Sequence, residues 1–273
     1  MKKRIRPHAS GFTLLELLVT TAIIATLAGI SATGYLSLRQ KARMVTEINA
    51  AKNLITAYLS YPSDHNGQVM PGYQSDPEVT DLDGRPLASP MNARYPWRLA
   101  ANAPRIDGVM LFNGNETALD EQNSDYLVSV KPNLGINAVF LGGHFGSGSP
   151  LPPSPRLLEA YGKFHLTHLA EAHAPEELIV FSSARSGKDS PGYFEIRSPK
   201  LTRPIWSSTE FSEDSPASSH GFVDFRYDGK TVTACLAGNV QLMDEDEMRD
   251  MRHWSNQAAI ENDPDFLIRV GSN

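Results

Sequence analysis

The chain has 273 residues, of which 41% are hydrophobic and 21% charged, a composition typical of a globular protein with one substantial domain and an extension. Four cations crowd the first positions (Lys2, Lys3, Arg4 and Arg6), and without them 21 basic side chains stand against 31 acidic ones, a net charge of −10. An acidic body of this kind excludes the basic face that nucleic-acid binding requires. The lone Cys235 excludes an intramolecular disulfide and a cluster of thiol metal ligands.

A long apolar run follows the basic start. From residue 12 to residue 38 the chain contains a single charged side chain, Glu16, and the run ends at Arg39. As a helix, this length is enough to cross ~30 Å of hydrocarbon. Three other interpretations compete with a functional one: a secretory signal peptide cut after the small-residue sequence Ala32-Thr33-Gly34, a plain membrane anchor, or a buried core helix. The run exceeds the roughly 7–15 apolar residues of a signal peptide and lacks the polar face of a core helix.

Glu16 separates these alternatives. A carboxylate near the end of a membrane helix is unfavourable by several kcal/mol unless it is paired, and it marks a functional position by default. A cut between Gly11 and Phe12 would create a partner, because the new α-amine of Phe12 is a cation that the Glu16 of a neighbouring chain could neutralise.

The residues around this point carry a family resemblance. The sequence Gly11-Phe12-Thr13-Leu14-Leu15-Glu16-Leu17-Leu18-Val19, behind a basic leader, resembles the processing site of type IV prepilins and type II secretion pseudopilins. The resemblance implies that a membrane-embedded aspartyl prepilin peptidase removes residues 1–11 and that Phe12 is then N-methylated. It also implies that Glu16 serves in methylation and in subunit registration during assembly. The chain departs from the family where Thr33 replaces a common helix-kinking proline and Ala25 a common glycine.

The helix is expected to continue beyond the apolar run. Apolar side chains recur every three or four residues, which is typical of an amphipathic helix packed on a domain: Met44, Ile48, Ala51, Ile55 and Tyr58. The other faces are expected to carry the polar residues Arg43, Glu47, Lys52 and Asn53. Tyr61-Pro62 is expected to end it. The sequence therefore predicts a leader at 1–11, a transmembrane or filament-core helix at 12–38, an amphipathic helix at 39–61 and a globular domain at 62–273.

The globular part reads as an α+β domain with an antiparallel sheet. Short apolar runs predict strands at 109–112, 126–130 and 178–181, and residues 157–172 predict a helix. A C-terminal meander is predicted from strands at 222–227, 231–236 and 240–243, with turns at Asp228-Gly229 and Gly238-Asn239. Asp-Gly between alternating strands is a strong hairpin signal. The acidic residues 244–247 predict the start of a helix.

The meander carries a second, weaker resemblance. Residues 226–229 and 234–240 align with the "H-X9-DG" segment found near the C-terminus of one large class of prepilin-like proteins, but Tyr227 stands in place of the histidine and Ala237 in place of an aspartate. We therefore derive from it a strand layout and no chemistry.

Other groupings favour ordinary structural roles. Asp81 and Asp83 with Gly84 resemble part of a calcium loop without the full ligand spacing, and Asp-x-Asp-Gly is more often a turn. His165, His168 and His173 could bind a metal, but a solvated helix face is the simpler interpretation. Ser182 and Ser183 lack the Gly-x-Ser-x-Gly turn of a hydrolase nucleophile. Trp97, Trp206 and Trp254 could form a carbohydrate-stacking surface, but buried core aromatics are the more common use.

Two classes of function remain. The first is a structural subunit, minor or specialised because its domain exceeds 200 residues, of a type IV pilus or a type II secretion pseudopilus. The second is a binding or enzymatic domain that is anchored in the membrane and exported with a pilin-type leader. The first class implies no enzyme activity and no cofactor. Its expected partners are prepilin peptidase, other pilin or pseudopilin subunits, the inner-membrane assembly platform and the membrane, but no nucleic acid. The expected location is the cytoplasmic membrane, in a single pass with the domain outside the cytoplasm, or a filament at the cell surface.

Overall fold

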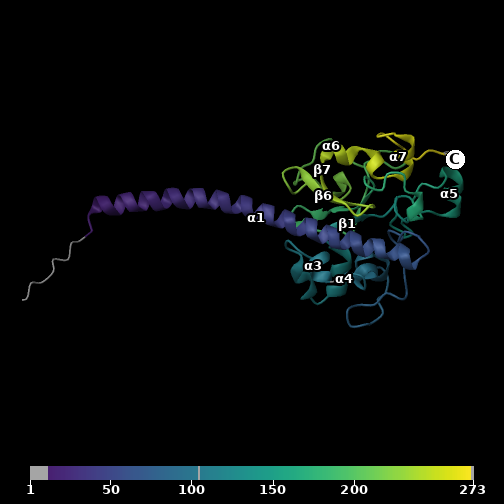
Figure 1. The fold of residues 1–273 in the computed structure, drawn as a ribbon, viewed down its shortest axis with the longest axis horizontal. Helices are drawn as coiled ribbons and strands as arrows, with labels where there is room; N and C mark the ends of the chain where they lie inside the picture. The colour runs from purple at the N-terminus through teal and green to yellow at the C-terminus, as the bar shows by residue number, and fades with distance from the viewer. Residues whose placement is uncertain (1–11, 104, 272–273) are drawn as a thin grey trace, which may run out of the picture. The chain divides into compact units, whose positions relative to one another are not determined.

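A computed structural model describes residues 12–103 and 105–271 (Figure 1). The chain divides into two compact units, Met1–Arg43 and Met44–Asn273, and helix α1 (Leu14–Asp64) contributes to both. The predicted helix from 14 to 61 is thus confirmed, and it ends three residues later than expected. Pro62 lies in its last turn, where its carbonyl accepts the N–H groups of His65 and Gly67, and the left-handed backbone at Asn66 and Gly67 turns the chain away.

Short helices and strands make up the rest of the second unit. The α-helices are α2 (Tyr95–Ala100), α3 (Ile106–Val109), α4 (Ser124–Val130), α5 (Pro155–Tyr161), α6 (Glu245–Arg249) and α7 (Asn256–Glu261). The 3-10 helices are η1 (Met91–Ala93), η2 (Glu116–Leu119), η3 (Leu169–Glu171), η4 (Ala217–His220) and η5 (Met251–His253). The strands are β1 (Leu134–Asn137), β2 (Ile179–Ser183), β3 (Arg185–Gly187), β4 (Ser190–Pro191), β5 (Glu195–Ile196), β6 (Lys230–Cys235) and β7 (Val240–Asp244).

A five-stranded sheet organises this unit. Its order is β5-β1-β2-β6-β7, with β5 parallel to β1 and every other pair antiparallel; β3 and β4 form a separate hairpin. The chain is therefore α+β with a mainly antiparallel sheet, as predicted. In Figure 1, α6 and α7 lie on one side of the strands, and α3 and α4 lie on the other.

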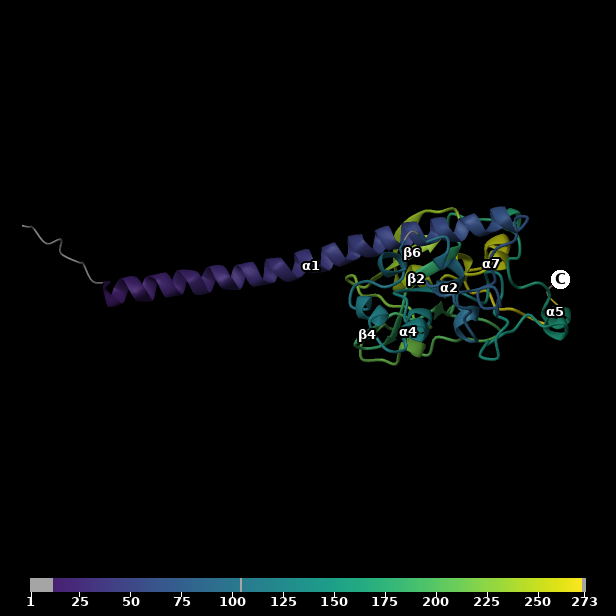
Figure 2. The same cartoon turned by 90° about the horizontal axis from the view of Figure 1, so that it is seen from below.

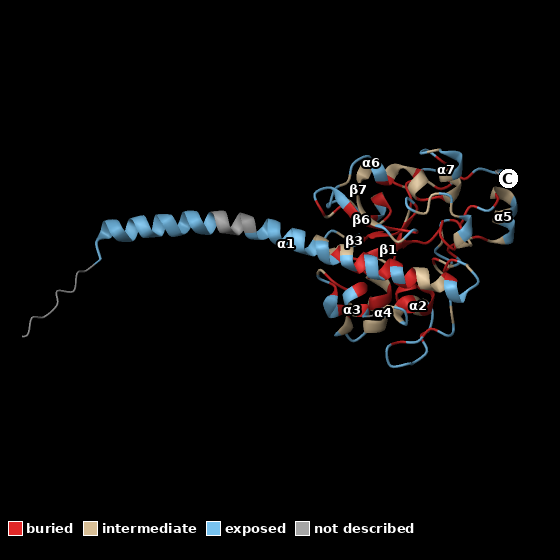
Figure 3. Ribbon diagram, in the orientation of Figure 1, coloured by how far each residue is buried: buried red, intermediate tan, exposed pale blue. Residues whose placement is uncertain are grey.

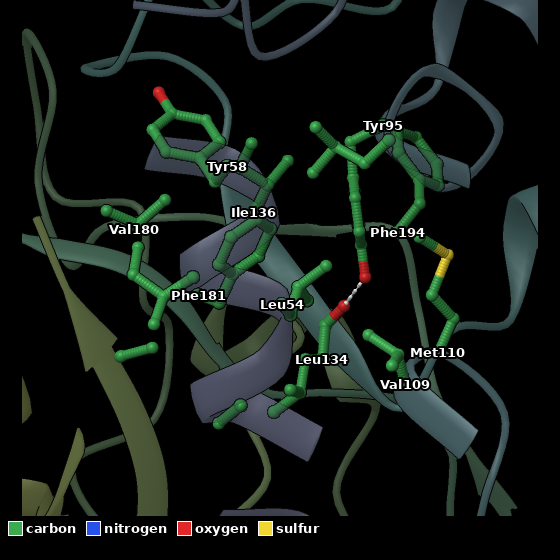
Figure 4. Packing of buried hydrophobic residues seen from close by; sticks show 14 of the residues in the cluster. Leu54, Tyr58, Tyr95, Val109, Met110, Leu134, Ile136, Val180, Phe181 and Phe194 are labelled. Atoms are coloured by element: carbon green, nitrogen blue, oxygen red, sulfur yellow. Dashed lines mark hydrogen bonds between the residues drawn. The ribbon is translucent and has the colours of Figure 1, made fainter. Parts of the chain in front are cut away.

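Two buried clusters fill the unit. The first joins the inward face of α1 to the sheet, and Tyr58 meets Phe181 of β2 edge-on with ring centroids 5.7 Å apart. Figure 2 shows α1 crossing over β2 and β6. Figure 4 shows Leu54 and Phe181 in this packing, together with the hydrogen bond that the Tyr95 hydroxyl donates to the Leu134 carbonyl. The second cluster joins the sheet to α6, η5 and α7 around Trp254.

The amphipathic pattern of residues 44–58 is confirmed, since Ala51, Ile55 and Tyr58 are buried and Met44 and Ile48 partly so. The predicted pairing of the last two strands is also confirmed, since β6 and β7 pair over five residues. Asp228 and Gly229 precede β6, and both have the positive φ of a two-residue turn (52° and 75°), which closes the bridge between Tyr227 and Lys230. Asp244 caps α6, its carboxylate accepting the N–H of Glu247, whose own carboxylate accepts the N–H of Asp244.

Four predictions of secondary structure were wrong. Residues 109–112 end helix α3 and enter a turn, and residues 126–130 belong to helix α4, because apolar runs this short carry no periodicity that separates strand from helix. The predicted helix at 157–172 ends at Tyr161, where Gly162 turns the backbone (φ 73°). Residues 163–168 are not helical and form isolated bridges at Leu166 and His168. Residues 222–227 form only isolated bridges, since Phe222 has a φ of 65°.

Candidate functional site

The start of α1 is capped by its own side chains. The Thr13 backbone N–H and hydroxyl both donate to Glu16 Oε2, at 2.9 and 2.7 Å, and the Glu16 N–H donates to Thr13 Oγ1 at 3.2 Å. This reciprocal arrangement is a capping box, and the sequence pattern Thr-x-x-Glu before an apolar run could have predicted it. Glu16 Oε1 makes no hydrogen bond with the residues that the structure describes.

The predicted processing point lies at this cap. Gly11 is outside the described residues, while Phe12 is 76% exposed and, with Thr13, precedes the helix. The arrangement leaves Phe12 accessible on non-helical backbone, with the carboxylate of Glu16 held at the N–H of the next residue.

Apolar side chains cover the following part of α1. They are all exposed, as Figure 3 also shows: Leu14, Leu15, Leu17, Leu18, Val19, Ile23, Ile24, Leu27, Tyr35, Leu36 and Leu38. The hydroxyls of Thr20, Thr21 and Thr26 turn back to carbonyls of the same helix, at 2.8, 3.0 and 2.9 Å. A hydroxyl satisfied in this way can enter an apolar environment without losing a hydrogen bond.

Within 12–103 and 105–271, no helix meets the combined length and hydropathy expected of a membrane crossing. The transmembrane assignment of residues 12–38 is therefore not confirmed.

A buried carboxylate was missed by the sequence analysis, which placed Glu47 on an outer face of the helix. Glu47 is fully buried; Ser183 and Tyr227 donate their hydroxyls to it, the latter at 2.5 Å, and a guanidinium nitrogen of Arg226 lies 3.6 Å away. The signal was its spacing, because Glu47 lies three residues after Met44 and four before Ala51, in phase with the buried face.

We call Glu47, Ser183, Arg226 and Tyr227 the Glu47 cluster. Tyr227 is the residue that replaces histidine in the C-terminal resemblance, and here its hydroxyl fastens the hairpin to α1. Arg226 also pairs with Asp224 at 2.9 Å and donates to the Ala184 carbonyl. Burial first, and then the adjacent Glu47 carboxylate, hold the pKa of Tyr227 far above its usual value, so its hydroxyl remains a donor.

The calcium candidates form a closed turn. Asp81 Oδ1 accepts the backbone N–H groups of Asp83 and Arg85, each at 2.9 Å, and Oδ2 pairs with the Arg85 guanidinium at 2.6 Å. Arg85 also reaches Asp83 at 3.1 Å. Although desolvation opposes it, this set of hydrogen bonds lowers the pKa of Asp81. Both carboxylate oxygens of Asp81 are thus already hydrogen-bonded within the turn. Among the residues that the structure describes, no group of three or more His, Cys, Asp and Glu side chains could hold a metal ion.

The histidines do not share a helix face. His165 lies in a bend and His168 precedes η3 on extended backbone, and the His173 N–H donates to Asn256 Oδ1 at 2.7 Å. The two serines of β2, Ser182 and Ser183, are hydrogen-bonded to neighbouring side chains and are not arranged as catalytic nucleophiles. Ser182 bonds the Thr231 hydroxyl at 2.8 Å, while Ser183 belongs to the Glu47 cluster.

The three tryptophans are core residues, as the alternative to a stacking surface predicted. Their indole N–H groups donate to carbonyls of Asp125, Arg197 and Met248, at 2.7, 2.8 and 2.8 Å for Trp97, Trp206 and Trp254 respectively. Cys235 is also buried, and burial raises the pKa of its thiol to about 12.

Comparison with known proteins identifies a family motif in one segment of the chain. Residues 6–32 match the model of the prokaryotic N-terminal methylation motif. No match was found among curated proteins or among solved structures. The matched segment includes Phe12, the capping pair of Thr13 and Glu16, and the start of the exposed apolar surface of α1. The motif supports a prepilin-type or pseudopilin-like protein.

Proposed function

We propose that this protein is a pilin-like structural subunit, minor or specialised, of a type IV pilus or a type II secretion pseudopilus. One observation carries the proposal: the methylation motif at 6–32 coincides with a helix whose apolar side chains are exposed and whose hydroxyls are satisfied internally. Exposed apolar surface on this scale is unfavourable in water and requires a lipid or protein partner. A membrane before assembly and packed helices within a filament would both supply one.

In this proposal the chain is divided by task. Residues 1–11 are a leader that prepilin peptidase removes, and residues 12–38 anchor the chain in the cytoplasmic membrane and later form the filament core. Residues 39–61 join this helix to an extracytoplasmic domain at 62–273, and the assembly platform and other subunits complete the set of partners. The protein acts by assembling and not as an enzyme.

Glu16 has a specific task in the proposal. Its Oε2 is occupied by Thr13, and Oε1 is left for the methylated Phe12 ammonium of a neighbouring subunit. Within packed apolar helices an unpaired carboxylate is costly, so this pairing would set the axial register between subunits.

Processing is tested by mass analysis of the mature N-terminus. The expected chain begins at N-methylated Phe12, and Gly11→Ala or a bulkier replacement leaves the precursor uncut. A mature N-terminus at Tyr35 would indicate an ordinary signal peptide and would refute the proposal.

Assembly is tested separately with Glu16→Ala and Glu16→Gln. Both variants should insert and be cleaved but enter filaments poorly, because Phe12 is left without a counter-charge. Crosslinking of membrane fractions compares them with the wild type. Thr20→Val is a matched control that should assemble normally. It removes a polar group from the same helix, but this hydroxyl already donates to a carbonyl of the helix itself. Equal assembly of all forms would show that Glu16 does not determine register.

The size of the second unit, Met44–Asn273, favours one alternative, a membrane-anchored binding or enzymatic domain that uses the pilin-type leader for export. Correct processing of Phe12 in a cell whose filaments contain none of the protein would favour this alternative.

A further inference from the structure

A cavity of about 270 Å³ lies between the non-helical segment 163–166, with η3 beyond it, and helix α7. Its walls comprise one ion pair, one histidine, two amides and three apolar side chains. In chain order they are Lys163, Phe164, His165, Leu166, Glu171, Asn256, Gln257 and Ile260.

The charges in the cavity neutralise each other. Lys163 Nζ lies 2.6 Å from Glu171 Oε1, and Glu171 Oε2 accepts the Thr167 N–H, the Thr167 hydroxyl and the His168 N–H, each at 3.3 Å. Desolvation raises the pKa of Glu171, but the hydrogen bonds from Lys163, Thr167 and His168 outweigh it and lower the value to about 2. The ion pair therefore persists at neutral pH and leaves no net charge for an ionic ligand to balance.

His165 supplies an unpaired polar atom. The side chain belongs to a residue only 8% exposed, and its Nδ1 has no hydrogen-bond partner among the residues that the structure describes. Burial first, and then the nearby Lys163 charge, lower the pKa of His165, so the ring is neutral at pH 7. This nitrogen is itself shielded from solvent, so the ring of His165 lines the cavity but its Nδ1 does not face a ligand there.

Apolar surface accompanies these polar groups. Ile260 is 50% exposed on α7, and Phe145, which is 47% exposed, meets the His165 ring edge-on with centroids 6.5 Å apart. Phe164 and Leu166 form the inner wall. The wall therefore combines polar groups with a smaller set of apolar side chains, which suits a small polar ligand that also has an apolar face.

We infer that this cavity binds one neutral monosaccharide unit. The volume lies just below the range of ~300–1,000 Å³ for ligand pockets, so the ligand is small. Sugar hydroxyls both donate and accept, which suits a wall that offers an ammonium, a carboxylate, an imidazole and the amide of Gln257. A sugar also has an apolar C–H face for Ile260. An anion or a cation would instead have to separate Lys163 from Glu171.

The full-length protein, held in a detergent without a sugar headgroup, allows a direct test by NMR of its histidine rings. Glucose, galactose, mannose and N-acetylglucosamine are titrated up to about 100 mM, where a site with a Kd of ~10 mM would be about nine-tenths filled. At least one sugar should shift the His165 ring signals saturably. His220 is the internal control, because it too is buried with an unpartnered Nδ1 among the described residues but lies outside the cavity.

Variants then locate the binding. Gln257→Ala should weaken the affinity about tenfold through the loss of hydrogen bonds, and Gln241→Ala, on β7, should not change it. The inference is overturned by any of three results: no saturable shift, equal shifts at His165 and His220, or equal affinity in both variants. Saturable binding of phosphate or acetate without sugar binding would also overturn it, since the cavity would then be an ion site.

Discussion

Replacing Glu47 with alanine should destabilise the second unit by about 2–4 kcal/mol. Removal of one member of a buried charge pair typically destabilises by ~3–5 kcal/mol, and each stranded hydroxyl adds ~1 kcal/mol or more. The loss should be smaller than the sum of these energies, because Arg226 retains its ion pair with Asp224 at 2.9 Å and Ser183 Oγ still accepts the Val232 N–H. The Tyr227 hydroxyl loses its hydrogen bond to the Glu47 carboxylate, while Asn113 Nδ2 still donates to its oxygen at 3.3 Å.

Urea unfolding followed by tryptophan fluorescence measures this effect in the full chain. Trp97, Trp206 and Trp254 all lie in the second unit and are buried, so a detergent around the apolar part of α1 does not obscure the signal. The midpoint should fall without a change in slope. Glu78→Ala is the matched control, because this glutamate is exposed, and a surface substitution changes stability by no more than about 0.5 kcal/mol.

A double-mutant cycle with Tyr227→Phe tests the cause. The combined variant should lose about 1 kcal/mol less than the sum of the single ones, since both substitutions remove the same hydrogen bond between Tyr227 and Glu47. Additive effects, or a loss below about 0.5 kcal/mol for Glu47→Ala, would refute the reasoning that the buried carboxylate joins α1 to the hairpin.

Three other predictions concern stability. A protein that begins at Leu38 should be soluble, monomeric and cooperatively folded, which ultracentrifugation and urea unfolding check; aggregation would show that the helix boundary is misplaced. Gly229→Ala should destabilise by about 1 kcal/mol in the same unfolding assay because of the φ of 75° at that position, whereas Gly108→Ala, in α3 at an ordinary φ with open space around it, should be neutral or stabilising; equal effects would contradict the turn geometry. Burial lowers the pKa of His220 despite its hydrogen bond with Glu245, so its contribution to stability is complete above the unfolded pKa of about 6.5 and declines as the pH falls from there towards the lower folded value. His220→Gln should flatten this dependence in unfolding measured at pH 5 to 8, and an unchanged slope would exclude His220 as its source.

The sequence predicts most where the physical signal is local. The periodicity of residues 44–58 and the Asp228-Gly229 turn each specify their structure within a few residues, and both were confirmed, although the strand predicted before the turn did not form. The candidate site at the start of α1 was found from Glu16, the single charge in the apolar run, and from the motif at residues 11–19. The cap between Thr13 and Glu16 is equally local, although it was not predicted.

Prediction fails where tertiary contacts decide. Residues 126–130 read as a strand, but they form helix α4, in which Ser129 accepts a hydrogen bond from Arg94 and the Asp125 carbonyl one from Trp97. Glu47 looked like a surface residue because its partners lie 136 and 180 residues away in sequence. No local pattern contains that information.

The long sequence span of the Glu47 cluster also bears on when the domain can fold. A ribosome releases Glu47 early, but the hydroxyl of Tyr227 follows only 180 residues later, and β6, which pairs with β2, comes after it. Until then the inward face of α1 has neither its sheet nor the donors for its carboxylate. Folding of this domain must therefore be largely post-translational and slow relative to a chain with local contacts. A nascent chain halted before the hairpin should remain sensitive to proteases along its whole globular part.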